Sequence, residues 1–316
     1  MKKTIFLLTM MLFSCNKDNK IVLSSSGNLN EISVVISNEF WEGEVGKELK
    51  KTFSKPIYGL PQQEPLFKLR QIPPEVFSGF VTRSRAIIKI QKNKTLQTGV
   101  IKNKYASPQT MIVVSGPNST AIIKQIKANS RAIISNLKKS ELAEKNRRIR
   151  KSLSKSKALE ALFKIKLDFP SIYRVAAAEQ GFAWLRKDIK SGSVNLSIYA
   201  MPLDDKITTR NIIAIRDSVS QARIPGPIEG SYMSTDPQYI STSSQIKISN
   251  MTATETRGLW EVKKQFMGGP YINLSVMDST NNRVLFFDGF VYSPATAKAS
   301  YIFELEAIIK SLKILK

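Results

Sequence analysis

One stretch of the chain, from Ser119 to about Lys157, has the composition of a helix and contains neither proline nor glycine. At 1.5 Å per residue, an unbroken helix of that length would extend for roughly 55 to 60 Å, which is longer than either flanking domain. We therefore expect a break within it and a folded part on each side. Residues 31–118 would form an N-terminal α+β domain, residues 119–160 a basic helical connector, and residues 161–316 a C-terminal α+β domain.

The first fifteen residues carry a short positive head and an apolar run, and they end in the only cysteine of the 316-residue chain. Lys2 and Lys3 precede the run from Thr4 to Leu12, which has the length of the apolar part of an export signal. A membrane-spanning helix needs about 20 apolar residues, so this run is too short to be one. We interpret residues 1–14 as a signal peptide. The alternative, a small buried thiol, requires the segment to be retained and folded.

Leu12, Phe13, Ser14 and Cys15 resemble the lipobox of bacterial lipoproteins. The resemblance implies that diacylglycerol is attached to the Cys15 sulfur and that Cys15 becomes the N-terminus. Two or more acyl chains hold a protein stably on a membrane, whereas one does not. We therefore expect an envelope protein anchored through lipid on Cys15, in the outer membrane facing the periplasm, with residues 15–30 as a tether.

The composition excludes several kinds of chemistry. The chain has no histidine, which excludes a Ser-His-Asp or Cys-His nucleophile and a His-ligated zinc site. We expect no cofactor and no metal. The 48 Lys and Arg against 25 Asp and Glu give a formal charge of +23. An exported protein with this charge meets anionic lipids and not nucleic acid, so we expect no nucleic-acid partner.

The N-terminal domain has the pattern of a small α+β unit. Residues 32–36 form a β-branched strand, and Asn38 is the expected N-cap of the helix that follows. Four prolines within residues 59–80 predict a loop without regular structure. Three more strands are expected, at residues 85–91, 98–105 and 110–116. The short connections between these strands favour an antiparallel sheet.

The C-terminal domain combines many strands with two helices. Strands are expected from Phe163 onward, a helix over residues 208–223, and a proline- and glycine-rich loop over residues 224–237. The runs "YINLSVM" and "RVLFFDGFVY" alternate in polarity and predict a hairpin. A final helix should pack an apolar face on this sheet. The expected fold class is α+β: two domains with mainly antiparallel sheets and packing helices, joined by a long basic helical segment.

Five stretches of the chain resemble an uncharacterised lipoprotein family of Bacteroidota that is known only as a domain of unknown function. They are "SSSGNLNEISVVI", "FWEGEVGKELKKTF", "GLPQQEPLF", "QGFAWLR" and "RGLWEVKKQFMGGPYINLSVMD". The resemblance implies an envelope lipoprotein and supplies no activity or catalytic residue. The hairpin and final helix also resemble, more loosely, sheets of the PsbP and Mog1 type, and similarity of fold does not establish function.

The basic stretch 145–157 is a candidate binding surface. Residues 121–166 hold fourteen Lys or Arg and three Glu, a net charge of +11. The four candidate contacts are Arg147, Arg148, Arg150 and Lys151. They would bind anionic lipid or an acidic envelope protein. The same composition is typical of a solvated helix face in a lysine-rich chain, and both interpretations remain open.

Two tryptophans and one loop are further candidates. Trp184 and Trp260 lie in amphipathic strand patterns and are expected in the core. Each has a cation nearby, Arg186 or Lys263, an arrangement that can also stack on a sugar or a lipid headgroup. The loop at 224–237 is long and stiffened by proline, which makes it the best loop for recognition, and an ordinary loop that covers the domain is the alternative.

We expect a non-enzymatic envelope protein that binds a partner or an anionic surface. The alternative is a hydrolase that uses two carboxylates on envelope glycan, which requires two Asp or Glu facing one cleft. The pattern Asp-Ser followed by Val or Thr resembles the O-glycosylation site of Bacteroidota envelope proteins. It gives Ser218 and Ser279 as candidate modification sites, with Ser279 in an expected turn.

Overall fold

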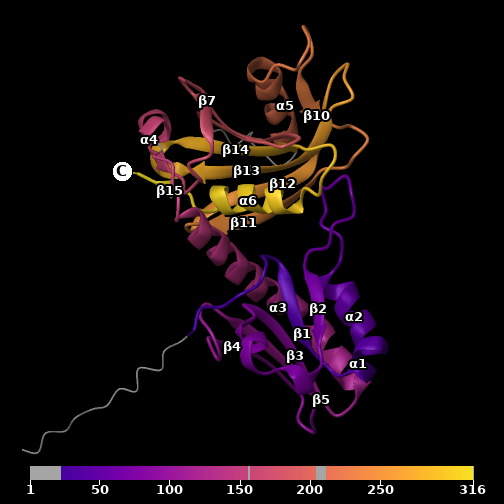
Figure 1. The fold of residues 1–316 in the computed structure, drawn as a ribbon. Helices are drawn as coiled ribbons and strands as arrows, with labels where there is room; N and C mark the ends of the chain where they lie inside the picture. The colour runs from indigo at the N-terminus through magenta and orange to yellow at the C-terminus, as the bar shows by residue number, and fades with distance from the viewer. Residues whose placement is uncertain (1–22, 156, 204–210, 316) are drawn as a thin grey trace, which may run out of the picture.

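The computed structural model describes residues 23–155, 157–203 and 211–315. They form two domains, each built on its own sheet, with a long helix that leads from the first domain to the second (Figure 1). The protein is α+β, and its sheets are mainly antiparallel. Within the described ranges, no helix combines the length and the apolar character that a membrane crossing requires.

The N-terminal sheet has five strands in the order β2-β1-β3-β5-β4. Their bounds are Glu31–Val35 (β1), Lys68–Ile72 (β2), Ala86–Lys92 (β3), Gln97–Lys102 (β4) and Thr110–Gly116 (β5). Three of its pairings, β1–β2, β1–β3 and β3–β5, are parallel, and β4–β5 is antiparallel. The prediction of an antiparallel sheet is therefore wrong for this domain. Helices connect β1 to β2, which allows these two strands to run in parallel. The chain goes from β3 to β4 at the edge of the sheet and then returns as β5 between them, so β5 is antiparallel to β4 and parallel to β3.

The proline-rich stretch contains a strand that the sequence does not predict. Strand β2 lies between Pro65 and Pro73 at the edge of the sheet and pairs with β1. Because the prolines flank this strand and do not interrupt it, they remove no ladder hydrogen bond. Two short 3-10 helices, Pro74–Val76 (η1) and Gly79–Arg83 (η2), continue the chain to β3.

The helix after β1 is divided at Gly43 into α1 (Asn38–Glu42) and α2 (Glu44–Phe53). Its N-cap is Ser37 and not Asn38, since the Ser37 hydroxyl accepts the Phe40 N–H. The apolar side chains of α2, Val45, Leu49 and Phe53, are buried in the core against the sheet.

A single helix, α3 (Ser119–Ile149), fills most of the predicted connector. Its 31 residues extend for about 46 Å and end eight residues before Lys157, where α4 (Lys157–Phe163) begins. The first part of α3 packs into the N-terminal core through Ile122, Ile126, Ile133 and Leu137. The connector is therefore largely a core helix of the N-terminal domain.

The C-terminal domain is built on an eight-stranded antiparallel sheet with the order β10-β12-β13-β14-β9-β8-β7, in which β11 also pairs with β12. The strand bounds are Arg174–Glu179 (β7), Phe182–Ile189 (β8), Gly192–Pro202 (β9), Met233–Thr235 (β10), Thr242–Ile248 (β11), Met251–Val262 (β12), Gly268–Asp278 (β13) and Arg283–Tyr292 (β14). The predicted hairpin is confirmed as β13–β14. The strand expected at 163–169 is reduced to Ile165–Lys166 (β6), which pairs with Lys313–Ile314 (β15).

Helices cover both faces of this sheet. The final helix, α6 (Ala299–Ile309), packs on β13 and β14 as predicted. Helix α5 (Ile212–Arg223) belongs to a separate apolar cluster, in which Ile212 is buried with Trp260 and Phe286. The sheet is therefore the middle layer of three, and the α5 side carries the candidate site.

Ion pairs and a helix cap join the two domains. Lys145, near the end of α3, binds Glu304 of α6 at 2.7 Å. The carboxylate of Glu64 accepts the Lys298 and Ala299 N–H groups at 2.6 and 3.0 Å, where α6 begins. These contacts use buried or half-buried charges, and they hold α6 against the end of α3 and against the loop before β2.

Candidate functional site

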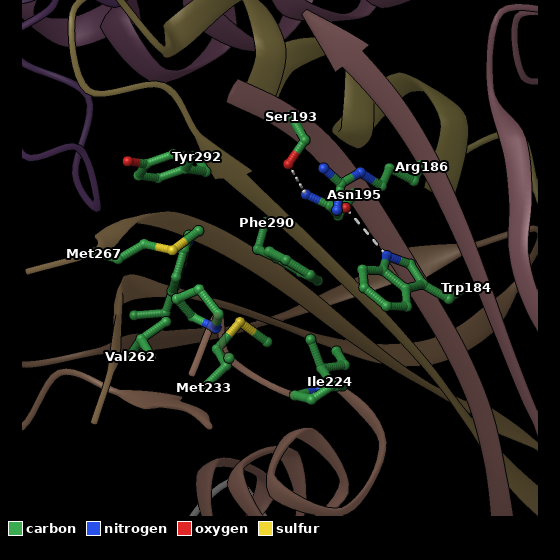
Figure 2. Close-up of a pocket in the computed structure, with 14 residues that line it drawn as sticks. Trp184, Arg186, Ser193, Asn195, Ile224, Met233, Val262, Met267, Phe290 and Tyr292 are labelled. Carbon is green, nitrogen blue, oxygen red and sulfur yellow. Dashed lines mark hydrogen bonds between the residues drawn. The ribbon is translucent and has the colours of Figure 1, made fainter. Parts of the chain in front are cut away.

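A partly open cavity of about 280 Å³ lies on the α5 side of the C-terminal sheet (Figure 2). Strands β8, β9, β12 and β14 form its floor. Its cover is the segment between α5 and β10, residues 224–232, which we call the cover loop. We call the cavity the aromatic pocket, because its wall includes Trp184, Trp260, Phe290 and Tyr292.

Strand geometry explains why these side chains converge. Residues two apart on a strand point to the same face, so Trp184 and Arg186 of β8 project together, as do Phe290 and Tyr292 of β14. The register pairs Arg186 and Phe290 with the same β9 residue, Asn195, from its two sides. Three neighbouring strands thus bring aromatic and polar groups to one place.

Trp260 lies at the centre of the aromatic wall, and 2 % of its surface is exposed. Its ring centroid is 5.7 Å from that of Phe290, in an edge-to-face arrangement, and 6.5 Å from that of Tyr292. Met233 and Met267 add flexible thioether surface. An apolar wall with a few polar groups is typical of a site for a small organic molecule.

Three of the polar groups form a short chain of hydrogen bonds. The Trp184 Nε1–H donates to Asn195 Oδ1 at 3.1 Å, and Asn195 Nδ2 donates to Ser193 Oγ at 2.9 Å (Figure 2). Arg186 donates from Nε to Asp188 at 2.8 Å, and this hydrogen bond lowers the pKa of Asp188. Arg186 also lines the pocket.

The indole N–H of Trp260, unlike that of Trp184, has no hydrogen-bond acceptor among the described residues. The group is buried. Leaving a buried donor without an acceptor costs about 1–3 kcal/mol. Trp260 lines the pocket, so an acceptor atom on a bound molecule that reached Nε1 would remove that cost.

The cover loop is closed by its own hydrogen bonds. Gly226 N donates to Ser231 O at 2.9 Å, and Ser231 Oγ donates to Ile228 O at 2.6 Å. A side chain at Gly226 would lie 2.2 Å from Ser231 Oγ and 2.9 Å from Val262, so only glycine allows this close approach. The pocket is therefore largely formed before any ligand arrives.

Beneath the cover, α5 is held on the sheet by a buried ion pair. Arg216 Nε lies 2.8 Å from Asp288 Oδ1, and the guanidinium lies 4.0 Å from the centre of the Tyr271 ring. Beside it, Asp217 accepts hydrogen bonds from the N–H and hydroxyl of Thr235 at 2.7 and 2.8 Å. Burial raises the pKa of Asp288, although Arg216 opposes the shift. These contacts fix α5 and β10, the two ends of the cover loop.

Two family models match the sequence. Residues 152–311, just over half of the chain, match the model described as Domain of unknown function (DUF4837). The chain belongs to the DUF4837 family. Residues 25–150 match a second model, Domain of unknown function (DUF8532). The two matches meet where α3 ends, and the aromatic pocket lies within the DUF4837 part.

Solved structures resemble the chain only weakly. One from Bacteroides thetaiotaomicron is 14 % identical with a TM-score of 0.27, and the match covers 48 % of this chain and 46 % of that one. The Saccharomyces cerevisiae Ran-binding protein Mog1p is 6 % identical with a TM-score of 0.32, over 48 % of this chain and 91 % of its own. Scores this low transfer neither fold nor function. No curated protein matches the sequence.

The basic residues singled out from the sequence lie at the end of α3, away from the aromatic pocket. Arg147 and Arg148 both bind Glu144, at 2.6 and 2.7 Å, and Arg150 binds Asp168 at 2.7 Å. Lys151 is exposed. Burial opposes the shift, but the hydrogen bonds from the two arginines lower the pKa of Glu144 to about 2. Two carboxylates therefore offset part of the charge of these four residues.

The other predicted residues are scattered. Ser218 lies on α5 and Ser279 in the 3-10 turn Ser279–Asn281 (η3), and both are exposed. Cys15 lies outside the described residues. Trp184 and Trp260 do come together, joined by the first part of the loop at 224–237.

Sequence reasoning missed Phe290, Tyr292 and Met267. All three were assigned to a hairpin strand or a turn, and a core residue and a pocket residue look alike in such a pattern. The sequence "MGGP" at residues 267–270 favours a turn between strands, and this prediction is wrong in part, since Gly268 to Pro270 begin β13.

Carboxylates are not gathered in the aromatic pocket, whose lining contains neither Asp nor Glu. Glu31 and Glu64 line another cavity, between the domains, where Glu64 caps α6. No group of three His, Cys, Asp or Glu suited to a metal ion occurs in the described part of the chain. The geometry favours binding over carboxylate chemistry at this site.

Proposed function

We propose that this chain is a lipid-anchored protein of the bacterial envelope whose DUF4837 part binds a small amphipathic molecule in the aromatic pocket. The observation that carries the proposal is the pocket itself, an aromatic and methionine wall with a few polar groups, in which the buried Trp260 N–H has no acceptor among the described residues. A preformed cover and a rigid sheet support recognition without a large ordering cost.

The lining indicates the class of ligand. A volume of about 280 Å³ is close to the lower end of small-molecule sites, about 300–1,000 Å³, so one ring system or a short acyl chain fits. The aromatic and methionine side chains suit an apolar body. Arg186 is the cation of the lining, which favours a carboxylate, sulfonate or phosphate head. A sugar would leave most of its hydroxyl groups unpaired against this wall.

A fluorescence titration with 1-anilinonaphthalene-8-sulfonate tests the pocket, because this probe joins an apolar ring system to an anion. We expect Arg186→Gln to weaken binding about tenfold, since a charge-assisted hydrogen bond is lost. Trp260→Phe should weaken it about two- to tenfold while leaving stability unchanged or raised, because the unpaired donor is removed.

Trp41→Phe is the matched control, as Trp41 lies on α1 of the other domain. It should bind the probe as the parent protein does. Equal affinity in the parent, Arg186→Gln and Trp260→Phe proteins would place the probe elsewhere and refute the proposal.

The lipid anchor is supported by the lipobox resemblance around Cys15 and has its own test. In a bacterial host that processes lipoproteins, Cys15→Ala should move the protein from the membrane fraction to the soluble or periplasmic fraction. Metabolic labelling with palmitate should mark the parent protein and not the variant. A variant that stays in the membrane fraction would contradict the anchor.

A further inference from the structure

The mouth of the aromatic pocket is flanked by two exposed apolar side chains. Phe266, in the turn between β12 and β13, is fully exposed (112 %), and Ile228, in the cover loop, is 49 % exposed. Their neighbours Met267 and Pro227 line the pocket. We call Phe266 and Ile228 the apolar lip. It continues the apolar wall of the pocket to the outside of the molecule.

Lysines surround the apolar lip. Lys263 and Lys264 lie in the same turn as Phe266. A Cβ atom at Gly230 would be 3.9 Å from Lys264 Nζ, so the cover loop and this turn lie side by side. Lys190 lies in the β8–β9 turn, at the end of the sheet where Tyr292 enters the pocket.

Carboxylates balance only part of this charge. Glu261 binds Lys263 at 2.5 Å, and Asp188 is bound by Arg186. Glu229 lies in the cover loop. Lys190 and Lys264 are exposed and form no ion pair with a described residue. The surface around the lip is therefore apolar at its centre and basic at its rim.

We propose that the apolar lip inserts into the headgroup region of an anionic lipid bilayer. An exposed phenylalanine gains apolar contact there, while lysines at the rim are attracted to anionic headgroups. Two side chains on separate turns are too small a patch for a stable protein interface, which buries about 800 Å² on each partner. Shallow insertion into lipid needs no such area.

The position of the lip allows this contact. Helix α5 and strand β10, which carry the cover loop, lie at the end of the C-terminal domain that points away from the N-terminal domain (Figure 1). The inference does not rest on the proposed ligand, since a lip can insert whether or not the pocket is filled.

Cosedimentation with vesicles tests the lip in a chain that starts at Asn16 and so lacks Cys15 and the apolar run. Every described helix and strand lies after that point, so none is lost. With phosphatidylglycerol-containing vesicles, Phe266→Ser should weaken binding at least tenfold. Lys190→Gln with Lys264→Gln should weaken it and reduce its salt dependence. Vesicles of phosphatidylcholine alone should bind less of the parent chain.

Two control variants separate the lip from other surfaces. Phe80 is also exposed (68 %) but lies in the N-terminal domain, so Phe80→Ser should change binding less than twofold. Replacing Arg147, Arg148, Arg150 and Lys151 together by Gln tests the basic stretch. Loss of binding in that variant, with Phe266→Ser unaffected, would overturn the lip and assign the contact to the basic stretch.

A second measurement stays informative if a variant folds poorly. The fluorescence of a Phe266→Trp protein should be quenched by vesicles whose acyl chains carry bromine, beyond the quenching of the parent protein. Equal quenching of the two proteins would place residue 266 outside the bilayer and overturn the proposal.

Discussion

Replacing Arg216 by leucine should lower the free energy of unfolding by about 3–5 kcal/mol, because the change leaves Asp288 buried without its counter-charge. Both side chains are almost completely buried, and Asp288 Oδ2 has no partner among the described residues even in the parent protein. Urea unfolding followed by circular dichroism at about pH 7 measures the difference. An unchanged midpoint would show that the pair does not hold α5 on the sheet.

The pH dependence of the Arg216→Leu protein provides an internal check. Burial already raises the pKa of Asp288, and loss of Arg216 raises it further. The folded state then holds a proton that the unfolded state has released. Stability is therefore highest below the unfolded pKa of 3.8 and falls as the pH rises toward the folded pKa. The defect should be smaller at about pH 4 than at about pH 8.

A double variant separates charge from packing. In Arg216→Leu with Asp288→Leu, no ion is left without a partner, and apolar replacement of a buried ion pair is often close to neutral. Most of the lost stability should return. If the double variant is as unstable as the single one, shape and the stacking on Tyr271 matter more than charge.

The strongest local patterns predicted the C-terminal fold well. The β13–β14 hairpin shows period-two alternation around an Asn-Asn turn, and Asn282 takes the left-handed conformation that such a turn requires. The spacing of the apolar residues of α6 likewise predicts its buried face, and α6 packs on β13 and β14 as expected. Both features depend on residues close together in the sequence.

The N-terminal sheet shows where this reasoning fails. Parallel pairing of β1 with β2 joins segments more than thirty residues apart, and no local pattern reports it. The prolines near β2 predict a loop without regular structure, yet prolines that flank an edge strand remove none of its ladder hydrogen bonds. The length of α3 is also set by tertiary contacts, since four of its isoleucines and leucines are held in the core.

The candidate site was predictable only in outline. Trp184, Trp260 and the cover loop could be singled out because tryptophan, arginine and proline are individually distinctive. Their convergence needed the register of β8, β9 and β14, which places Arg186 and Phe290 on either side of Asn195. The charge of the basic stretch is partly offset, because Arg147 and Arg148 share Glu144 and Arg150 pairs with Asp168, a contact that the local sequence does not show.

Glu306→Gln is expected to cause a loss of similar size, about 3–5 kcal/mol at neutral pH, through a network that reaches both domains. Glu306 lies on α6 and is buried. It binds Arg257 at 2.7 Å and Lys310 at 2.5 Å, and Lys138 of α3 lies 4.0 Å away. Without the carboxylate, Arg257 and Lys310 keep Glu255 as their one anionic partner among the described residues. Urea unfolding should show the loss as a lower midpoint.

At acid pH, the free energies of unfolding of this variant and of the parent protein should become similar. Burial alone would raise the pKa of Glu306, but Arg257 and Lys310 hold it far below the usual 4.5. Ionised Glu306 therefore raises the free energy of unfolding of the parent protein above about pH 5. This contribution is lost as the pH falls toward the lowered pKa of the folded state, and the variant lacks it at every pH. Glu44→Gln, at an exposed pair with Lys47, is the matched control and should unfold as the parent does. The difference in the free energy of unfolding between the parent and Glu306→Gln could instead stay constant from about pH 7 to about pH 3. That result would mean that lost hydrogen bonds, and not charge, account for the effect.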